Sequence, residues 1–368
     1  MPDTRRVLIT GVSRFLGARL AAALETDPSI ERIVAVGARA PSVYLQRTDF
    51  LRADLRHRSI GRLVRTLELD TVVHAGLIVD PLGVSAHSAH ETNVIGTMNL
   101  LAACGGSGSP VRKFIVAAST AIYGAESADP SMWSESMHRT APARDAFTRD
   151  LDEVESYVAA FAQRSPEATV TVLRFADMLG RTRTTPFARL FDLPVVPTVL
   201  GFDPRLQFVH EDDCVAVLER AVRHDLPGTF NVAGEGVVVL SQAISMLGRR
   251  SAPVIPFAGS GLTMFALNRV RPPGAPPLGL QPHLVRLLQF GRGVDTTALR
   301  EVFGASLRYT TAEAVLDRRA HRHGPERLGS VSEQDAGEVE LDRFIETRTV
   351  AWNGHRPAAK RRPAGSRA

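Results

Sequence analysis

A short glycine-bearing loop near the start of the chain constrains the fold more than any other feature. Residues 10–17 read Thr-Gly-Val-Ser-Arg-Phe-Leu-Gly, between an apolar run at 7–10 and a helical pattern at 15–25. Gly11 permits a sharp turn from strand to helix, and Gly17 allows the helix to pack closely on a sheet. The free N–H groups at the start of such a helix favour a pyrophosphate. The loop therefore predicts a dinucleotide site, with a tight turn that binds nothing as the alternative.

Short apolar runs alternate with helical patterns through the first half of the chain. The predicted strands cover residues 7–10, 33–36, 49–54, 71–74, 114–117 and 170–173, and a second clear helix covers 93–104. Continuous apolar strands separated by helices are typical of a parallel sheet with both faces covered. The sequence thus predicts an α/β fold with a doubly wound parallel sheet of the Rossmann type, which binds ligands at the carboxyl ends of its strands.

The composition is that of an ordinary globular protein with an excess of arginine. Of the 368 residues, 44% are hydrophobic and 23% are charged, and the net charge is +5. Basic residues cluster at 355–367, but Lys113 and Lys360 are the only lysines. The arginine excess fits a coding bias, and aromatic residues are nearly absent around the basic cluster. We therefore predict no nucleic-acid partner.

The cysteines and the apolar runs indicate a compartment. Cys104 and Cys214 are the only cysteines, in no metal-ligand or redox spacing, so a reducing cytoplasm is expected. No apolar run is long enough to cross a bilayer, so no membrane span is predicted. His210, Asp212 and Asp213 are typical of a helix start, and no metal site is predicted there.

Further segments resemble, in the same order, the motifs of the extended short-chain dehydrogenase/reductase superfamily, in particular its NAD-dependent epimerase/dehydratase family of UDP-glucose 4-epimerase type. The loop at 10–17 is similar to the family's TGxxGxxG fingerprint. The other matching segments are Asp54-Leu55, 70–76, 93–97 (NVxGT), 119–124, 173–180 (LRxxNxxG type), 205–213 (RxFxHVxD) and Asn231-Val232. The resemblance covers about residues 5–317. It implies NAD or NADP as cofactor, a nucleotide sugar or related small molecule as substrate, and a homodimer as one possible assembly.

The resemblance also implies a set of site residues. Those expected at the cofactor are Gly11, Arg14, Phe15, Leu16, Gly17, Gly37, Arg39, Asp54, Leu55, Ala75, Gly76, Asn93 and Ser119. Those expected at the substrate are Thr120, Tyr123 and Arg205.

Two departures from the family pattern concern the cofactor. Arg14 replaces the middle glycine of the fingerprint, where its guanidinium either binds a phosphate or points into solvent. The acid that would bind the adenosine ribose is expected about 20 residues after the loop, where Gly37 stands with Arg39 close by. A missing acid beside an arginine favours NADP slightly over NAD.

The family's catalytic pair is missing. The family uses a Tyr as acid/base, a Lys four residues later that lowers the Tyr pKa, and a Ser or Thr. Ser119 is the only retained member, because Phe147 and Leu151 occupy the Tyr and Lys positions. No tyrosine of the chain has a lysine four residues after it. Substitutes would be Tyr123, His74, Asp145 or Arg149, each of which is more typical of a structural residue.

Domain organisation follows from the same resemblance. Residues 1–180 are predicted to form the dinucleotide-binding domain, to which 205–250 return. Residues 181–204 and 251–317 are predicted to form a smaller, loop-rich substrate lobe with prolines at 253, 256 and 272–277. Residues 318–368 have few apolar side chains and are predicted to be a disordered basic tail.

Two functions remain open from the sequence. One is a divergent nucleotide-sugar epimerase or dehydratase with an atypical or relocated acid/base, for which the resemblance of the substrate lobe argues. The other is a non-catalytic NAD(P)-binding sensor or scaffold, for which the missing pair argues.

Overall fold

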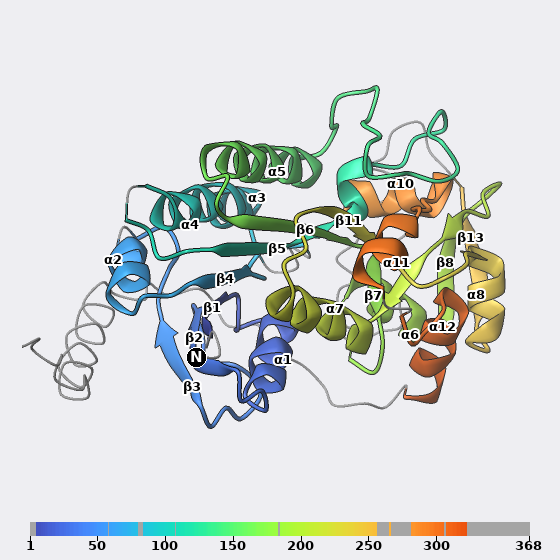
Figure 1. Cartoon of the computed structure of the whole chain (residues 1–368). Coiled ribbons are helices and arrows are strands. Elements are labelled where there is room, and N and C mark those ends of the chain that lie inside the picture. Colours follow the sequence, from blue (N-terminus) through green and yellow to red (C-terminus); the bar gives the residue numbers. More distant parts are fainter. Residues whose placement is uncertain are drawn as a thin grey trace, which may run out of the picture.

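Parallel strands run through the middle of the computed structural model (Figure 1). The structure describes residues 5–57, 59–79, 84–106, 108–182, 185–255, 265, 281–304 and 307–321. The strands are β1 (Arg5–Thr10), β2 (Ile30–Gly37), β3 (Thr48–Arg52), β4 (Thr71–His74), β5 (Lys113–Ser119), β6 (Thr169–Phe175), β7 (Asp177–Leu179), β8 (Val195–Val199), β9 (Arg205–Leu206), β10 (Phe208–His210), β11 (Gly228–Val232), β12 (Val238–Val239) and β13 (Arg250–Val254).

Seven of these strands form one sheet in the order β11-β6-β5-β4-β1-β2-β3, and every neighbouring pair is parallel. The chain moves outward from β1 to β3, then crosses back to β4 and moves outward in the other direction. The predicted doubly wound sheet is therefore confirmed. The bounds differ slightly from prediction, because the third strand ends at Arg52 rather than at residue 54.

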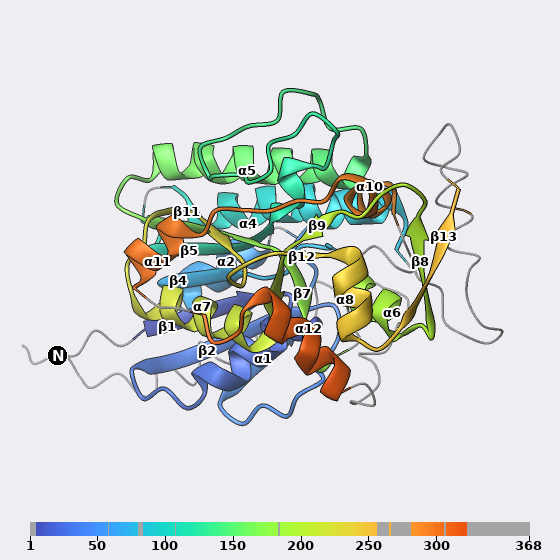
Figure 2. The ribbon, with the colours of Figure 1, turned by 90° about the vertical axis from the view of Figure 1, so that its right-hand side faces the viewer.

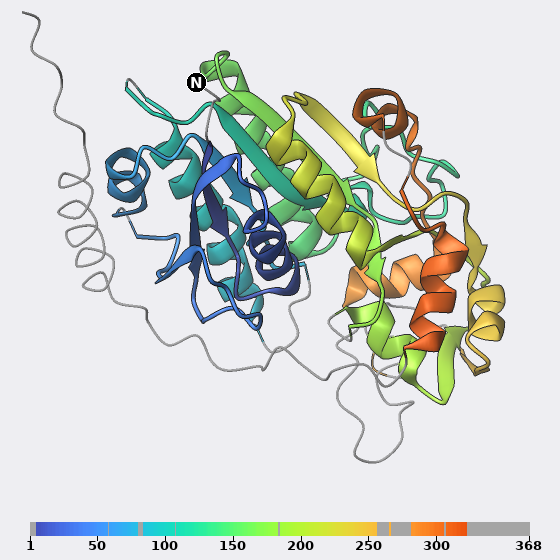
Figure 3. The ribbon, with the colours of Figure 1, turned by 60° about the horizontal axis from the view of Figure 1, so that its bottom comes forward.

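Helices cover both faces of this sheet and also form much of the smaller lobe. They are α1 (Phe15–Leu24), α2 (Ser59–Thr66), α3 (Ala86–His90), α4 (Gly96–Cys104), α5 (Ala146–Arg164), α6 (Pro186–Asp192), α7 (Glu211–Arg223), α8 (Leu240–Met246), α10 (Pro282–Phe290), α11 (Thr297–Phe303) and α12 (Thr311–Ala320), with a π-helical turn η1 (Glu91–Ile95) and a 3₁₀ turn η2 (Thr120–Tyr123). In Figure 1, α4 and α5 lie above the sheet, α2 lies at its left-hand end, and α1 and α7 lie below it. Figure 3 shows α1 (dark blue) and α7 (yellow-green) side by side on the lower face.

Each face of the sheet has its own apolar core. Leu20, Leu24, Leu218 and Val222 of α1 and α7 pack on one face, and α2, α4 and α5 pack on the other. Strand β4 is buried along its whole length, which explains why it reads as a continuous apolar run rather than an alternating one.

The helix predicted at 93–104 begins earlier than expected. It starts at Ala86 with α3 and passes through the π turn η1 before α4. Among the described residues, no helix is both long and apolar enough to cross a membrane.

The helices α6, α8, α10 and α12 of the smaller lobe gather on one side of the molecule (Figure 2), and the lobe has a third apolar core of its own. Its members come from α6, α8, α10 and α12 and from the short strands around them. The lobe contains a parallel pair of strands, β8 and β13, where a loop-rich region was expected. Helix α8 belongs to this core, so only part of the segment 205–250, chiefly α7 and β11, returns to the central sheet. Residues 256–264 and 266–280, with most of the prolines, lie outside the described residues.

The boundary expected at residue 318 falls inside α12. The Arg318 side chain is 1% exposed, and its Nη2 lies 2.7 Å from both carboxylate oxygens of Asp192 in α6. Its Nη1 donates to the carbonyls of Gly180, Arg181 and Thr182. Arg318 is therefore a buried part of the smaller lobe. Residues 322–368 of the predicted tail lie outside the described residues.

Candidate functional site

The loop between β1 and α1 is folded for close backbone approach. Gly11 has a φ of +79°, and a Cβ atom there would lie 2.4 Å from the Ala75 carbonyl oxygen and the Gly76 Cα. A Cβ at Gly17 would lie 2.7 Å from the Gly11 carbonyl oxygen. Both glycines are therefore required by packing, and the loop lies against the turn that follows β4.

The N-terminus of α1 opens onto this loop. Arg14 is the N-cap residue, its side chain makes no capping hydrogen bond, and no acidic residue lies in the first turn. The Arg14 N–H donates to the Gly11 carbonyl and the Ala18 N–H donates to the Arg14 carbonyl. The intervening N–H groups of Phe15, Leu16 and Gly17 are the ones that a helix start offers to an anion. The structure thus fits the pyrophosphate of a dinucleotide.

The end of β2 is crowded and basic. A Cβ at Gly37 would lie 2.5 Å from Ser13 Oγ, so no acidic side chain fits there without a shift of the loop. The Ser13 hydroxyl donates to the Arg39 carbonyl at 2.7 Å and accepts the Arg39 N–H at 2.9 Å, which joins the two loops. Arg52 is the register partner of Gly37 and donates to the Ala38 carbonyl.

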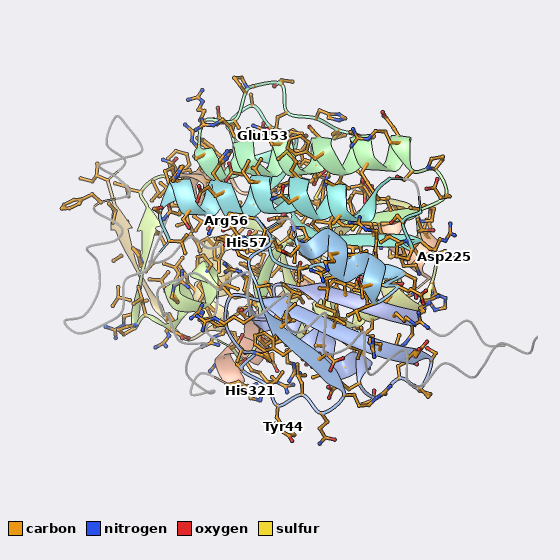
Figure 4. The ribbon with its side chains drawn as sticks, turned by 90° about the vertical axis from the view of Figure 1, so that its left-hand side faces the viewer. Tyr44, Arg56, His57, Glu153, Asp225 and His321 are labelled. Carbon is orange, nitrogen blue, oxygen red and sulfur yellow. The ribbon has the colours of Figure 1, made fainter. Side chains whose placement is uncertain are left out.

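Asp54, which was expected to contact the adenine, forms hydrogen bonds within the chain. Asp54 accepts hydrogen bonds from the Arg56 backbone N–H and from its guanidinium. Burial opposes ionisation of Asp54, but the bonds to Arg56 dominate and lower its pKa. Arg56 also pairs with Glu91 at 2.8 Å. In Figure 4, Arg56 and His57 lie next to each other below helices α4 and α5. Leu55 packs near Gly96, at the start of α4.

The turn after β4 is held by Asn93. The buried Asn93 amide accepts the Ile78 N–H at 2.6 Å and donates to the Ile78 carbonyl at 3.2 Å. Its π-helical turn positions the side chain for this pair. Asn93 was expected to bind the cofactor directly, but it instead fixes the segment that carries Ala75 and Gly76.

His74 is a fully engaged structural residue. Its Nδ1 lies 2.7 Å from Thr10 Oγ1 and its Nε2 lies 2.9 Å from Thr97 Oγ1. Because the Thr97 hydroxyl donates to the Asn93 carbonyl, it accepts from Nε2–H, and Nδ1 must accept from Thr10. Burial lowers the His74 pKa to about 4. His74 therefore does not replace the missing acid/base.

Ser119 lies at the carboxyl end of β5, at the centre of the site edge. Its Oγ accepts the Ala121 N–H at 3.1 Å and so caps η2, which leaves its O–H proton for a ligand. Phe147 and Leu151 lie one turn apart in α5, which packs against η2. Leu151 is 1% exposed within the apolar core, and its aliphatic side chain supplies no charge.

Lys113 is engaged far from Ser119. Lys113 lies at the opposite end of β5, where its Nζ donates to the carbonyls of Ala221, Val222 and His224 and pairs with Asp225 at 2.8 Å. It therefore caps the C-terminus of α7.

Tyr123 was expected at the substrate, but it is 2% exposed. Its hydroxyl donates to Asn231 at 2.8 Å and accepts from Arg174 at 2.7 Å, and its ring stacks on Trp133. Burial is the largest influence on its pKa, which is raised. Tyr123 is thus a core residue that joins the sheet to the loop at 125–145.

A recess lies where the sheet meets the smaller lobe. Its polar lining includes Thr120, Asp177, Gln207 and Arg292. The Arg292 side chain is 6% exposed, and it lies 3.2 Å from Asp177 and donates to the Gly124 carbonyl. Burial raises the pKa of Asp177 and lowers that of Arg292. Thr120 was expected at the substrate, and it lines this recess. Arg205 was also expected there, but its side chain is exposed and does not line the recess, whereas its neighbour Leu206 does.

Two residues of this region were missed from the sequence. Asp177 stands at the Asn position of the LRxxNxxG-type segment, a departure that could have been noticed. His283 lies in the first turn of α10, and it belongs to no motif of the sequence that would have marked it as a site residue. Its ring packs on Phe147, with ring centroids 4.7 Å apart.

The remaining candidates are structural. Asp145 is the N-cap of α5 and accepts the Thr148 N–H, and Arg149 is exposed. Asp213 accepts the backbone N–H groups of Arg308 and Tyr309 at the start of α7. Within the described ranges, no group of three or more His, Cys, Asp or Glu side chains is arranged for a metal ion.

Comparison with known proteins agrees with this architecture. The model of the NAD dependent epimerase/dehydratase family matches residues 7–233. Uncharacterized proteins of Mycobacterium tuberculosis and Mycobacterium bovis are 38% identical over 316 residues, which are 84% of this chain and 82% of theirs.

Several solved structures have the same fold. MoeE5 in complex with UDP-glucuronic acid and NAD has a TM-score of 0.65 at 21% identity, over 86% of this chain and 99% of its own. UDP-glucuronic acid 4-epimerase from Bacillus cereus, in complex with UDP-glucuronic acid and NAD, has a TM-score of 0.65 at 16% identity over 86% and 99%. UDP-glucose 4-epimerase from Thermotoga maritima has a TM-score of 0.64 at 18% identity over 86% and 98%.

Proposed function

This chain belongs to the NAD dependent epimerase/dehydratase family, and we propose that it binds a nicotinamide dinucleotide and a nucleotide sugar without the family's Tyr–Lys chemistry. One observation carries this proposal. The phosphate loop keeps Gly11 and Gly17, while Phe147 and the buried Leu151 stand at the Tyr and Lys positions.

The chain's own residues fit the dinucleotide. The N–H groups of Phe15, Leu16 and Gly17 would hold the pyrophosphate, because Gly11 and Gly17 leave the space that a Cβ would fill. Ala75 and Gly76 would lie along the cofactor on the far side of the loop. When bound, the nicotinamide would supply hydride-transfer chemistry beside Ser119.

The surroundings of Gly37 favour a 2′-phosphate, which would make NADP the preferred cofactor. Arg39 and Arg52 flank the position, and Ser13 blocks an acid there. MoeE5 and the UDP-glucuronic acid 4-epimerase from Bacillus cereus carry NAD, so affinities for NAD and NADP are compared directly. We expect Arg39→Ala with Arg52→Ala to lower NADP affinity by about tenfold for each lost charged contact, with little change for NAD. An unchanged ratio of the two affinities would remove these arginines from the specificity argument.

The recess at Arg292 could receive one polar group of the nucleotide sugar that we propose as the second ligand. It combines a buried guanidinium, a hydroxyl and an amide where the sheet meets the smaller lobe, a common place for a small-molecule site. The similar solved structures named above bind UDP-glucuronic acid or UDP-glucose. We therefore propose a UDP-sugar for this chain.

Two further proposals concern the setting of the protein. We propose the cytoplasm, because Cys104 and Cys214 are free and buried, and burial raises the pKa of both thiols. We keep a homodimer as a prediction that light scattering of the purified chain would check.

A non-catalytic sensor or scaffold is the second candidate function. It is favoured by the same Phe147 and Leu151, and by the use of Lys113 as a helix cap. A phenol without a neighbouring cation is a poor base at neutral pH, and Phe147 lacks even the phenol.

The deciding experiment measures ligand binding and turnover in the same preparation. Calorimetry should show binding of NAD or NADP and of UDP-glucose to the wild-type chain, and mass spectrometry should identify any nucleotide that co-purifies. If no dinucleotide binds, the proposed function is wrong.

Turnover of UDP-sugars is then compared among wild type, Phe147→Tyr, Leu151→Lys and the double variant. Wild type should be a poor catalyst, and only the double variant should gain activity, because each group needs the other. Robust wild-type turnover that survives Ser119→Ala would show that other residues do the chemistry and would exclude the non-catalytic alternative.

A further inference from the structure

A second recess lies at the N-terminus of α5, next to Phe147. Its lining includes Gly124, Arg139, Asp145, Thr148, His283 and Arg286. The first four come from the sheet domain and the last two from α10 of the smaller lobe. Residues of both lobes therefore line this recess.

His283 is a polar group of this lining whose hydrogen bonding is incomplete. Its side chain is 9% exposed, and it forms no hydrogen bond to any described residue. The nearest charged atom is Asp145 Oδ1, which lies 4.0 Å from His283 Nδ1 and is too distant for a hydrogen bond. Because His283 lines the recess, its ring nitrogens are open to a hydrogen bond with a ligand that enters there.

The charged neighbours of His283 are already paired. Arg286 pairs with Glu126, Arg139 pairs with Asp152, and Asp145 accepts two hydrogen bonds from Thr148. Asp129, which also lines the recess, accepts the Glu126 N–H. The arginines of the lining are each paired with a carboxylate, so among the described residues no cation of the recess is left for a strongly anionic ligand.

The imidazole itself is neutral at pH 7. Burial lowers the pKa of His283 to about 4, Asp145 opposes this shift, and Arg292 acts in the same direction as burial. A neutral imidazole has one donor nitrogen and one acceptor nitrogen, which matches the single donor and the lone pairs of a hydroxyl group. Because Nδ1 faces Asp145, a proton on Nδ1 would be oriented by the carboxylate and Nε2 would be the acceptor.

The His283 ring contacts the residue at the family's Tyr position. The His283 ring lies against Phe147 with an interplanar angle of 37°, so it contacts the very side chain that replaces the family's Tyr. The structure thus supplies a polar ring from the smaller lobe where α5 has lost its phenol.

We propose that His283, oriented by Asp145, binds a hydroxyl group of a sugar-containing ligand in this recess. Nε2 accepts the hydrogen bond that the hydroxyl donates. The nature of the ligand rests on the proposed function, whereas the hydroxyl-binding role rests on the geometry of His283, Asp145 and Phe147.

The test separates the sugar from the nucleotide. Calorimetry with UDP and with UDP-glucose is carried out on full-length wild type, His283→Ala, His283→Gln and the exposed control His224→Ala. His283→Ala should lose about tenfold in affinity for UDP-glucose and little for UDP, since one hydrogen bond to the sugar is removed. His283→Gln, which keeps a donor and an acceptor, should recover part of the loss, and His224→Ala should resemble wild type.

Nitrogen chemical shifts of His283 give a second readout that a purely structural role would not move. UDP-glucose should shift the His283 Nε2 signal, and UDP should not. Equal losses for UDP and UDP-glucose, or an unmoved Nε2 signal while UDP-glucose binds, would overturn the His283 role and leave the proposed function intact. If neither UDP nor UDP-glucose binds to wild type, the proposed function fails and the role of His283 fails with it.

Discussion

At the scale of single residues, packing decides which predicted site residues can meet a ligand. Gly11, Gly17 and Ser119 lie at the carboxyl edge of the sheet with groups available to a ligand. Asn93 and Tyr123 were expected there too, but their polar atoms are used by Ile78, Asn231 and Arg174. Position along the chain alone could not separate these two groups.

Gly17→Ala should abolish dinucleotide binding. The new Cβ would lie 2.7 Å from the Gly11 carbonyl oxygen, so the loop must open and its N–H groups move out of line. Gly61→Ala is the matched control, because the nearest atom to its Cβ lies 3.5 Å away at the end of the Arg65 side chain. Calorimetry with NAD and NADP checks both variants. Wild-type affinity in Gly17→Ala would show that the loop does not hold the cofactor.

His74 should make the folded state sensitive to acid. Its folded-state pKa of about 4 lies below the ordinary value of 6.5, so its stabilising contribution is present above pH 6.5 and is lost as the pH falls toward 4. The loss at pH 5 should be about 2 kcal/mol from this residue, because a tenfold change in proton affinity corresponds to about 1.4 kcal/mol. Urea unfolding at pH 7.5 and pH 5 measures it.

The control for this prediction is His74→Gln, which should be less stable than wild type at pH 7.5 but should lose less on acidification. An equal acid loss in the variant would assign the effect to other groups, of which His283 is the first candidate because its pKa is also lowered to about 4.

At the scale of elements, helix ends and cores decide the limits of the domains. The sequence from residue 318 onward looks like a tail because it is rich in charge, yet α12 continues to Ala320. Its charged residue Arg318 is buried because Asp192 and three carbonyl groups surround the guanidinium. Composition indicates exposure only when the charge has no buried partner.

Truncation should place the true boundary. A chain ending at residue 317 loses the buried Arg318 guanidinium and should be less stable by about 3–5 kcal/mol, because the half-buried Asp192 carboxylate loses this ion pair and three carbonyl groups lose their donor. A chain ending at His321 should keep the stability of the full chain. The full chain with Arg318→Lys should lose most of the same stability, because lysine cannot form the paired contacts of the guanidinium. Thermal unfolding of the two shortened chains, the Arg318→Lys variant and the full chain measures these differences. Equal midpoints for the chains ending at 317 and 321 would support a domain boundary at residue 318.

At the scale of the whole molecule, contacts between the lobes control the substrate region. Arg292 joins Asp177 of β7 and the Gly124 carbonyl, and His283 packs on Phe147 of α5. Both contacts bring residues that are more than 100 positions apart into one region. The smaller lobe therefore completes the site that the sheet begins.

Asp177→Asn should raise the affinity for UDP. In the wild type, the Asp177 carboxylate lies 3.2 Å from Arg292 and competes with any anionic group of a ligand for the guanidinium. Removing this charge should improve UDP binding by about tenfold, the equivalent of about 1.4 kcal/mol. Calorimetry with UDP checks this, with Asp203→Asn on the exposed surface as the control. Weaker binding in Asp177→Asn would show that Asp177 orients Arg292 for the ligand instead.

The sequence by itself determined the sheet, the phosphate loop and the absence of the Tyr–Lys pair. These features depend on local periodicity and on neighbours within one turn, as with Gly11 and Gly17 around one loop or Phe147 and Leu151 in one helix. Only the tertiary structure decided that Tyr123 and Asn93 are engaged, that Arg318 is buried, and that His283 lies beside Phe147. These outcomes depend on partners brought together by folding, and neither the spacing nor the type of a residue specifies which distant group will satisfy its hydrogen bonds.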